Sequence, residues 1–230
     1  MSTFIETSVF FGVVVSLLAY GVGMLLKQRF HLGIFNPLLI SIVITIGVLL
    51  LWHIDYNTYN EGAKYLSYLL TPATVALAIP LYDQLAVLKK NWKAIFAGIA
   101  SGVLTSLLCV LALVLLFGLS HEEYVTLLPK SITTAIGIGI SEELGGYVSI
   151  TAAVIIITGV LGNVIGETIL KIFRITEPVA KGVALGSASH AIGTAKAMEL
   201  GEVEGAISSL SIVVSGIMTV IGASLFAGII

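Results

Sequence analysis

The stretch Gly182–Leu200, GVALGSASHAIGTAKAMEL, decides how the rest of the chain is interpreted. It is long enough to cross a bilayer as a helix, since about 20 residues span the hydrocarbon core. Yet it carries His190, Lys196, three hydroxyl side chains and three glycines. A charged side chain at the bilayer centre costs at least ~2.5 kcal/mol, so a lipid-facing helix would not keep these groups. We therefore expect protein or water to surround this stretch, and we expect it to form a site.

The composition is typical of a protein that crosses a membrane several times. Of its 230 residues 57% are hydrophobic and 10% are charged, whereas about a quarter of the residues in soluble domains are charged. The formal net charge of −2 gives no reason to expect a nucleic-acid partner. The single cysteine, Cys109, cannot form an internal disulfide, and the sequence has no Cys/His cluster of the kind that holds a structural metal. We expect no metal and no cofactor.

Apolar runs of about 20 residues, enough to cross the hydrocarbon core as helices, recur along the chain. The uninterrupted runs are Phe4–Leu26, Leu32–Trp52, Ala94–Leu119, Tyr147–Leu170 and Ala206–Ile230. Prolines, glycines or polar residues interrupt three further runs, which are Lys64–Gln84, Leu127–Gly146 and Gly182–Leu200. The sequence therefore predicts an all-α polytopic membrane protein, a single transmembrane domain over residues 1–230 with about seven or eight membrane segments.

The three interrupted runs are the best candidates for a site. Proline removes a backbone donor, and glycine loosens a helix. Inside a bilayer such breaks are tolerated only where protein or a water-filled cavity satisfies the freed backbone groups. Secondary transporters place their binding sites at discontinuous helices of this kind. We therefore expect substrate-binding groups on these runs.

The basic residues predict the orientation of the chain in the membrane. They cluster in three loops, at Lys27–His31, Lys89–Lys93 and Lys171–Lys181. Cytoplasmic loops carry an excess of Lys and Arg, so we expect these loops on the inside. The N-terminus and the acidic loops then lie outside, and these acidic loops are Asp55–Glu61, His121–Glu123 and Glu199–Glu204.

This orientation allows only an odd number of crossings between residues 121–123 and 171–181. Tyr147–Leu170 supplies one crossing, so Leu127–Gly146 should enter the membrane and return as a re-entrant hairpin. Gly137–Gly139 would form the tip of that hairpin. The alternative is a full crossing that violates the charge rule, which holds only statistically.

Weak internal similarity suggests a repeat. Pro72–Pro80 can be aligned with Pro129–Gly137. Alternatively, Lys64–Gln84 can be paired with Lys181–Leu200, which would run in the opposite direction, as in the inverted repeats of many transporters. Periodicity does not choose between these pairings. The repeat halves would be residues 1–120 and 121–230.

Treated as one helix, Gly182–Leu200 places its polar groups on two opposite faces. One face carries Ser187, His190 and Thr194, and the other carries Ser189, Gly193 and Lys196. His190 between two hydroxyls could bind a carboxylate or carry a proton, because its ordinary pKa is near physiological pH. The alternative is a buried histidine bonded to a neighbouring carbonyl. Lys196 could bind substrate, or it could extend along the helix to the membrane surface.

The other two interrupted runs offer groups of the same kind. After Pro129 the chain brings a cation and three hydroxyls together as a cradle for a small anion, from Lys130, Ser131, Thr133 and Thr134. The alternative is a plain helix start, since Ser and Thr are good caps. Thr71 and Thr74 flank a position where a helix could restart, and helix N-termini attract anions. We predict that the three runs converge near the middle of the membrane.

Two further polar patterns are interpreted as close helix packing. Three glycines accompany Asn163 and Glu167 on the sixth apolar segment, at Gly159, Gly162 and Gly166. Hydroxyls repeat at every fourth residue near the C-terminus, at Ser211, Ser215 and Thr219. Small residues of this kind let helix backbones approach one another in membranes. The same seams suggest a homodimer.

These motifs resemble the LrgB/CidB family, the large membrane subunits of bacterial antiholin-like and holin-like operons. The most specific part is Gly186–Ala195, GSASHAIGTA, which is similar to the family signature. Pro72–Tyr82 and Pro129–Thr134 are similar to the family pattern as well. The chain departs from that pattern at Thr71, where glycine is expected, and at Ala135, where proline is expected.

The resemblance implies two functions for this LrgB-type domain. One is control of murein hydrolase export and autolysis, through holin-like permeabilisation with a small LrgA/CidA-type partner. The other is transport of small monocarboxylates of the pyruvate, glycolate or glycerate type, as in a similar plastid protein. Buried polar groups on three interrupted runs favour transport, because a simple holin needs only short helices that aggregate. The resemblance also places the protein in the bacterial inner membrane.

An enzymatic role is not expected. The sequence contains no hydrolase elbow, metal motif or phosphate-binding loop. Ser187 and Ser189 beside His190 resemble a nucleophile and its base only superficially, since no acid that would orient the histidine is apparent.

Overall fold

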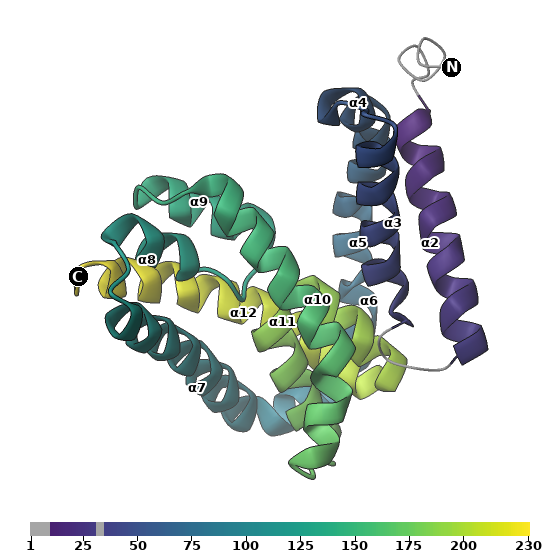
Figure 1. The fold of residues 1–230 in the computed structure, drawn as a ribbon. Coiled ribbons are helices and arrows are strands. Elements are labelled where there is room, and N and C mark those ends of the chain that lie inside the picture. Colours follow the sequence, from purple (N-terminus) through teal and green to yellow (C-terminus); the bar gives the residue numbers. More distant parts are fainter. Residues whose placement is uncertain (1–9, 31–34) are drawn as a thin grey trace. The chain divides into compact units, whose positions relative to one another are not determined.

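The computed structural model describes residues 10–30 and 35–230, apart from the side chains of Leu70 and Thr74. Within these ranges every regular element is a helix, so the protein is an all-α polytopic membrane protein, as predicted (Figure 1). The chain forms two compact units, Met1–Ala76 and Leu77–Ile230. The repeat halves predicted from the sequence stay a prediction.

The first unit is built around α2 (Phe11–Phe30), which packs against α3 (Pro37–Leu51) and α4 (Tyr56–Ser67). Close approach depends on glycine, because a Cβ on Gly12 would overlap the α4 backbone and one on Gly23 would lie 2.7 Å from the carbonyl oxygen of Pro37. The predicted starts of these spans, at residues 4–9 and 32–34, lie outside the described residues. The unit ends with α5 (Leu70–Ala76).

The run Lys64–Gln84 is broken, as its prolines predict. A turn at Leu77 separates α5 from α6 (Ala78–Asp83). Pro72 and Pro80 are each the third residue of their helix. The missing N–H of proline is harmless there, because the first four N–H groups of a helix have no partner within it.

Three helices of the second unit are long enough to cross a bilayer, namely α7 (Leu85–Phe117), α10 (Val148–Ile172) and α12 (Glu202–Ala227). Their ends identify a shared membrane side. His121 Nδ1 lies 2.8 Å from the carbonyl oxygen of Ile230, and the Tyr147 N–H donates to Thr126 Oγ1 at 2.8 Å. The end of α7, the start of α10 and the end of α12 therefore lie on the same side.

We call the other side the basic side, because Lys171, Arg174 and Lys181 line one pocket there. Lys90 of α7 belongs to the same side, since it shares a cavity with Glu177. Between residues 121–123 and 171–181, α10 is the one helix long and apolar enough to cross a bilayer, which agrees with the odd number of crossings expected from the charge pattern. Whether the basic side faces the cytoplasm stays a prediction.

The first hairpin consists of α8 (His121–Leu127) and α9 (Thr134–Glu143) and does not cross the membrane. At 1.5 Å per residue, α9 is about 15 Å long, half of the ~30 Å hydrocarbon core. A Cβ on Gly137 would lie 3.3 Å from the carbonyl oxygen of Pro129, so α9 packs back against the turn that follows α8. The predicted tip at Gly137–Gly139 is wrong. These residues are helical, and the chain reverses at residues 128–133, because Pro129 cannot continue the preceding helix.

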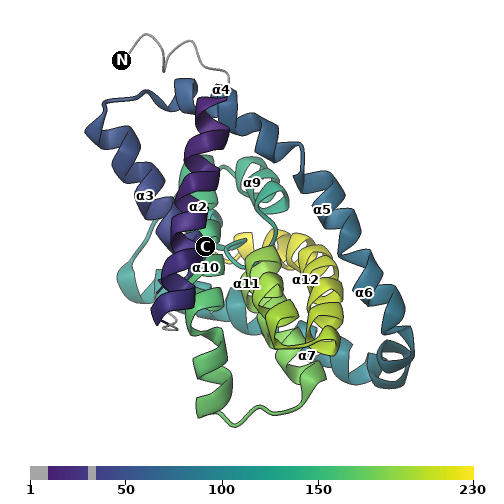
Figure 2. The same cartoon turned by 90° about the vertical axis from the view of Figure 1, so that its right-hand side faces the viewer.

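The second hairpin is α11 (Pro178–Leu200), which is broken at Ser189 (φ −136°, ψ 17°) and His190 (φ 41°, ψ −139°). A Cβ on Gly193 would lie 2.5 Å from the carbonyl oxygen of Leu185. In a continuous helix residues eight apart would be about 12 Å apart. The segment therefore folds back on itself, and both of its halves pack against α12 (Figure 2).

Two predictions about this segment are wrong. It is not one helix with two opposite faces, and Glu199–Glu204 does not lie across the membrane from the basic loop. Leu200 lines the pocket that holds Lys181, and Lys181 Nζ lies 3.5 Å from Glu204 Oε1. The loop charges could not reveal this arrangement, because acidic residues contribute little to membrane orientation.

Candidate functional site

The tips of the two hairpins both contact α7, at residues one helical turn apart. Ser131, in the tip of the first hairpin, lies 3.3 Å from Ser106, Oγ to Oγ. Ser187, next to the tip of the second hairpin, faces Gly102, whose Cβ would lie 3.1 Å from Ser187 Oγ. Gly102 and Ser106 are one helical turn apart, and Ser106 is about 16 Å from the end of α7 along its axis. The chain thus brings two of the three interrupted runs together.

A helix begins at each tip. The N-cap residue of α9, Thr133, makes no side-chain capping hydrogen bond, and Thr134 is the first helical residue. The second half of α11, Ala191–Leu200, begins directly after the break. Free N–H groups and the helix dipole favour an anion at such a position. The arrangement matches the discontinuous helices at which transporters hold anionic groups.

Lys130 adds a positive charge beside the first tip. Its Nζ donates to Ser131 Oγ at 3.0 Å. Within residues 77–230 no carboxylate lies within 4 Å of this ammonium group. Lys130 can therefore accept an anionic ligand without giving up an existing ion pair.

His190 is buried at the second tip, with 3% of its surface exposed. Its Nε2 lies 3.0 Å from the carbonyl oxygen of Ile155 on α10. A carbonyl only accepts, so Nε2 carries the hydrogen. The backbone at φ 41° is a conformation that side chains with a Cβ rarely adopt, and such strain costs about 1–3 kcal/mol. The site holds a histidine where glycine would fit the backbone better.

Glycines of α10 make room for the second hairpin, as the predicted packing seam requires. A Cβ on Gly159 would lie 2.7 Å from His190 Nε2, and one on Gly166 would lie 2.7 Å from Leu185. A Cβ on Gly162 would overlap Ser189. Ser189 therefore faces α10 together with His190, rather than an opposite surface.

Thr194 anchors the returning half of α11 to α12. Its Oγ1 lies 2.7 Å from Ser208 Oγ and donates to the carbonyl oxygen of His190 at 3.0 Å. Ser187 donates to the carbonyl oxygen of Val183 at 2.6 Å, so its hydroxyl is oriented along its own helix. The predicted hydroxyl seam of α12 is confirmed, since Ser211 faces Gly186 and its neighbours in the repeat are buried.

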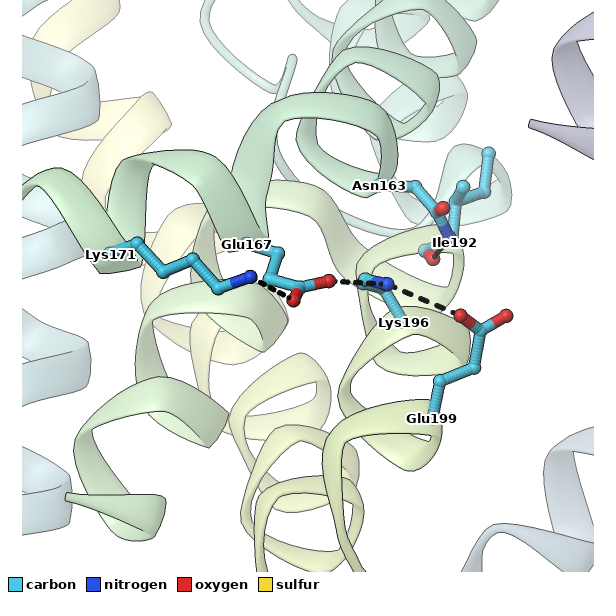
Figure 3. A network of polar contacts seen from close by, with 6 residues as sticks. All are labelled: Asn163, Glu167, Lys171, Ile192, Lys196 and Glu199. Atoms are coloured by element: carbon cyan, nitrogen blue, oxygen red, sulfur yellow. Dashed lines mark hydrogen bonds and ion pairs between the residues drawn. The ribbon is translucent and has the colours of Figure 1, made fainter. Parts of the chain in front are cut away.

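Lys196 is held in a network of charged side chains (Figure 3). Its Nζ lies 2.8 Å from Glu167 Oε2 and 3.3 Å from Glu199 Oε2. Glu167 also pairs with Lys171 at 2.7 Å. Nearby, Asn163 Nδ2 donates to the carbonyl oxygen of Ile192 at 2.7 Å (Figure 3). These contacts fasten the returning half of α11 to α10.

Asn163 and Glu167 therefore hold the returning half of α11 against α10, a role beyond the close helix packing predicted for their segment. The sequence carried one signal of this role, because a carboxylate inside an apolar run generally has a cationic partner. The partner could not be named, since Lys196 becomes a neighbour of Glu167 only when α11 folds back.

We predict that the two lysines bound to Glu167 contribute unequally to stability. Lys196 is 16% exposed and Lys171 is 73% exposed. Solvent weakens exposed pairs, which contribute about 0–1 kcal/mol. In double-mutant cycles with Glu167→Gln, Lys196→Met should show a coupling free energy above about 1 kcal/mol, and Lys171→Met less than about 0.5 kcal/mol. Equal coupling in thermal unfolding would contradict the network described above.

A cavity leads from the basic side to the second tip. It has a volume of about 730 Å³ and lies between α7 and the first half of α11. Lys90 and Glu177 lie at its entrance, and Gly102 and Ser187 lie at its inner end. Gly98 and Gly102 leave space on the α7 wall of the cavity. A Cβ at either position would lie 3.1 Å from an α11 side chain.

The remaining predicted site residues belong to the first unit. Thr71 is exposed on α5, and the side chain of Thr74 lies outside the described residues. The convergence of Thr71–Thr74 with the two hairpin tips stays a prediction. Binding of a substrate by any of the predicted residues also stays a prediction.

Comparison with known proteins gives consistent matches along almost the whole chain. The profile of the LrgB-like family matches residues 16–229. The antiholin-like protein LrgB of Bacillus cereus (strain B4264) is 41% identical over 218 residues, which cover 94% of this chain and 95% of that protein. The antiholin-like protein LrgB of Bacillus anthracis (strain CDC 684 / NRRL 3495) matches with the same identity and coverage. No solved structure matches.

Proposed function

The chain belongs to the LrgB-like family, and from this membership we propose that it acts as an antiholin-like protein of the membrane. The observation that carries the proposal is similarity over nearly the full length of relatives with that name. Those relatives match the spans and both hairpins together, rather than one motif. The proposed role is control of membrane permeability, and through it of murein hydrolase export and autolysis.

The proposal includes a setting for this role. The protein would lie in the bacterial inner membrane with its N-terminus outside and its basic side in the cytoplasm. It would work with a small LrgA/CidA-type membrane protein, and it would form a homodimer. The seams of small residues that suggested the dimer pack α11 against α10 and α12 within one chain, so a dimer would use another surface. No catalytic step is part of the proposed role.

The test is the rate of autolysis in bacterial cells that make the small partner with or without this chain. Cells with the wild-type chain should lose turbidity more slowly after lysis is triggered. Gly162→Ala, which disturbs the second hairpin, should remove the effect. Gly139→Ala, which has open space around its new methyl group, should preserve it. Equal lysis rates at equal amounts of membrane-inserted protein would refute the proposal.

The geometry favours a second candidate function, the transport of small monocarboxylates such as pyruvate, glycolate or glycerate. The specific observation is that both hairpin tips contact α7, one helical turn apart, and that a helix starts at each tip. A carboxylate would accept hydrogen bonds from the free N–H groups at these starts and from Lys130. The cavity between α7 and α11 supports a route to this position from the basic side.

Uptake of labelled carboxylates into proteoliposomes tests this second candidate. Lys130→Gln should lower the initial rate by roughly tenfold or more, because a hydrogen bond to a charged group contributes about 1.5–3 kcal/mol. Lys89→Gln removes the same charge at an exposed position of α7 and should leave the rate unchanged. A leak that is equal for pyruvate and for uncharged glycerol, and unaffected by His190→Ala, would exclude carboxylate transport.

A further inference from the structure

A second pocket lies at the basic end of α10, separate from the hairpin tips. It has a volume of about 480 Å³. Its lining combines cationic side chains, contributed by Lys171, Arg174 and Lys181, with an apolar wall of Leu170, Ile175 and Leu200. We propose that this pocket binds the phosphate group of an anionic phospholipid.

The charge of the pocket suits a phosphate. Glu167 is the acidic residue in its lining, and that carboxylate is already shared between Lys171 and Lys196. Arg174 forms no ion pair within residues 77–230. A guanidinium group binds phosphate in a bidentate manner. The pocket can therefore accept an anion on Arg174 without displacing a carboxylate.

The depth of the pocket in the membrane suits a lipid headgroup. At 1.5 Å per residue, α10 is about 37 Å long, whereas the hydrocarbon core is ~30 Å thick. The last residues of α10 therefore reach the headgroup layer. Basic pockets at this level, between helices, are typical binding sites for anionic lipids.

The apolar surroundings distinguish a lipid from a soluble phosphate compound. Ile172 and Phe173 directly precede Arg174 and are 69% and 72% exposed. Leu170 and Leu200 continue this apolar surface into the pocket. Acyl chains would cover these side chains, while free phosphate would leave them in water. An amphipathic ligand fits both parts of the pocket.

The backbone of Arg174 supports the assignment independently. Its φ is 54°, and the Ile175 N–H donates to the carbonyl oxygen of Leu170 at 2.8 Å. This is the hydrogen bond of a Schellman helix end, in which the left-handed position is usually glycine. Arginine there is sterically disfavoured, so its presence indicates a use for the guanidinium group.

Arg174→Gly gives a sharp test, because glycine suits this backbone and removes the cation. The full-length protein in detergent is offered equal amounts of phosphatidylglycerol and phosphatidylcholine, and retained lipid is counted by native mass spectrometry. Wild-type protein should prefer phosphatidylglycerol. Arg174→Gly should lower that preference roughly fivefold, the contribution of one basic residue near an anionic membrane surface. Lys89→Gln, outside the pocket, should keep the wild-type preference.

Three outcomes would overturn the proposal. The first is equal retention of both lipids by wild-type protein, and the second is an undiminished preference in Arg174→Gly. The third is thermal stabilisation by inorganic phosphate that is lost in Arg174→Gly while phosphatidylglycerol has no effect, which would assign the pocket to a soluble phosphate compound. Arg174→Gly should unfold at or above the wild-type temperature, so loss of lipid cannot be attributed to misfolding.

Discussion

Gly162→Ala is expected to lower the thermal midpoint by roughly 5 °C or more and to abolish the function of the second hairpin. The new Cβ would overlap Ser189 Oγ and lie 2.5 Å from Ser189 Cβ. Rotation of the hydroxyl removes only the first overlap, so either α10 or the tip must move. Overpacking typically costs about 1–3 kcal/mol, and each kcal/mol shifts the midpoint of a protein this size by about 2–4 °C.

A matched control and a rescue make this prediction specific. Gly139→Ala adds the same methyl group to α9, where nothing lies within 4 Å, and it should be neutral or slightly stabilising. Ser189→Gly removes both atoms that the new Cβ would meet, so Gly162→Ala combined with Ser189→Gly should recover most of the lost stability. If the double variant is no more stable than Gly162→Ala, then Ser189 does not face Gly162 as described.

The crossing helices could be predicted from the sequence because their signal is local. About 20 apolar residues in a row have one low-energy arrangement in a bilayer. For the same reason the prolines of Lys64–Gln84 and Leu127–Gly146 correctly marked breaks. The lengths differ from prediction mainly at the ends, where α7 extends back to Leu85 and places Lys89 and Lys90 within the helix.

The turning points could not be predicted, because distant residues determine them. Glycines at 137 and 139 were obvious tip residues, yet both are helical, and the chain turns just after Pro129. In α11 the break falls at neither Gly186 nor Gly193. Each is needed instead for close packing, Gly186 against Ser208 and Gly193 against Leu185. The break lies where Gly159 and Gly162 of α10 leave room for His190 and Ser189.

The geometry of the candidate site could be predicted only in part. Two of the interrupted runs do contact α7 one helical turn apart, but the prediction assigned Lys196 to the side opposite the basic loop. It lies beside Glu167 because α11 reverses at the tip. A helical-wheel projection cannot predict that reversal, because it assumes one straight helix axis for the whole segment.

The break in α11 predicts an unusual order of stability among variants of His190. His190→Gly should be more stable than His190→Ala by about 1–2 kcal/mol, because alanine keeps a strained backbone conformation that glycine adopts freely. Both variants lose the imidazole and its bond to Ile155, so these losses cancel in the comparison. Unfolding midpoints in a mixed-micelle denaturant series would measure the difference.

A continuous helix predicts the opposite order, because glycine is about 1 kcal/mol less favourable than alanine in a helix interior. Ala195→Gly is the internal control, since Ala195 is an exposed residue of the returning half and should lose about that amount. The same exchange of alanine for glycine thus has opposite signs at positions 190 and 195 if the chain reverses at the tip. Equal signs would mean that α11 is unbroken and that Lys196 is not brought to Glu167. The second hairpin, on which both proposed functions depend, would then not exist. Loss of activity in both His190 variants, despite the higher stability of His190→Gly, would in turn assign the imidazole to function rather than to folding.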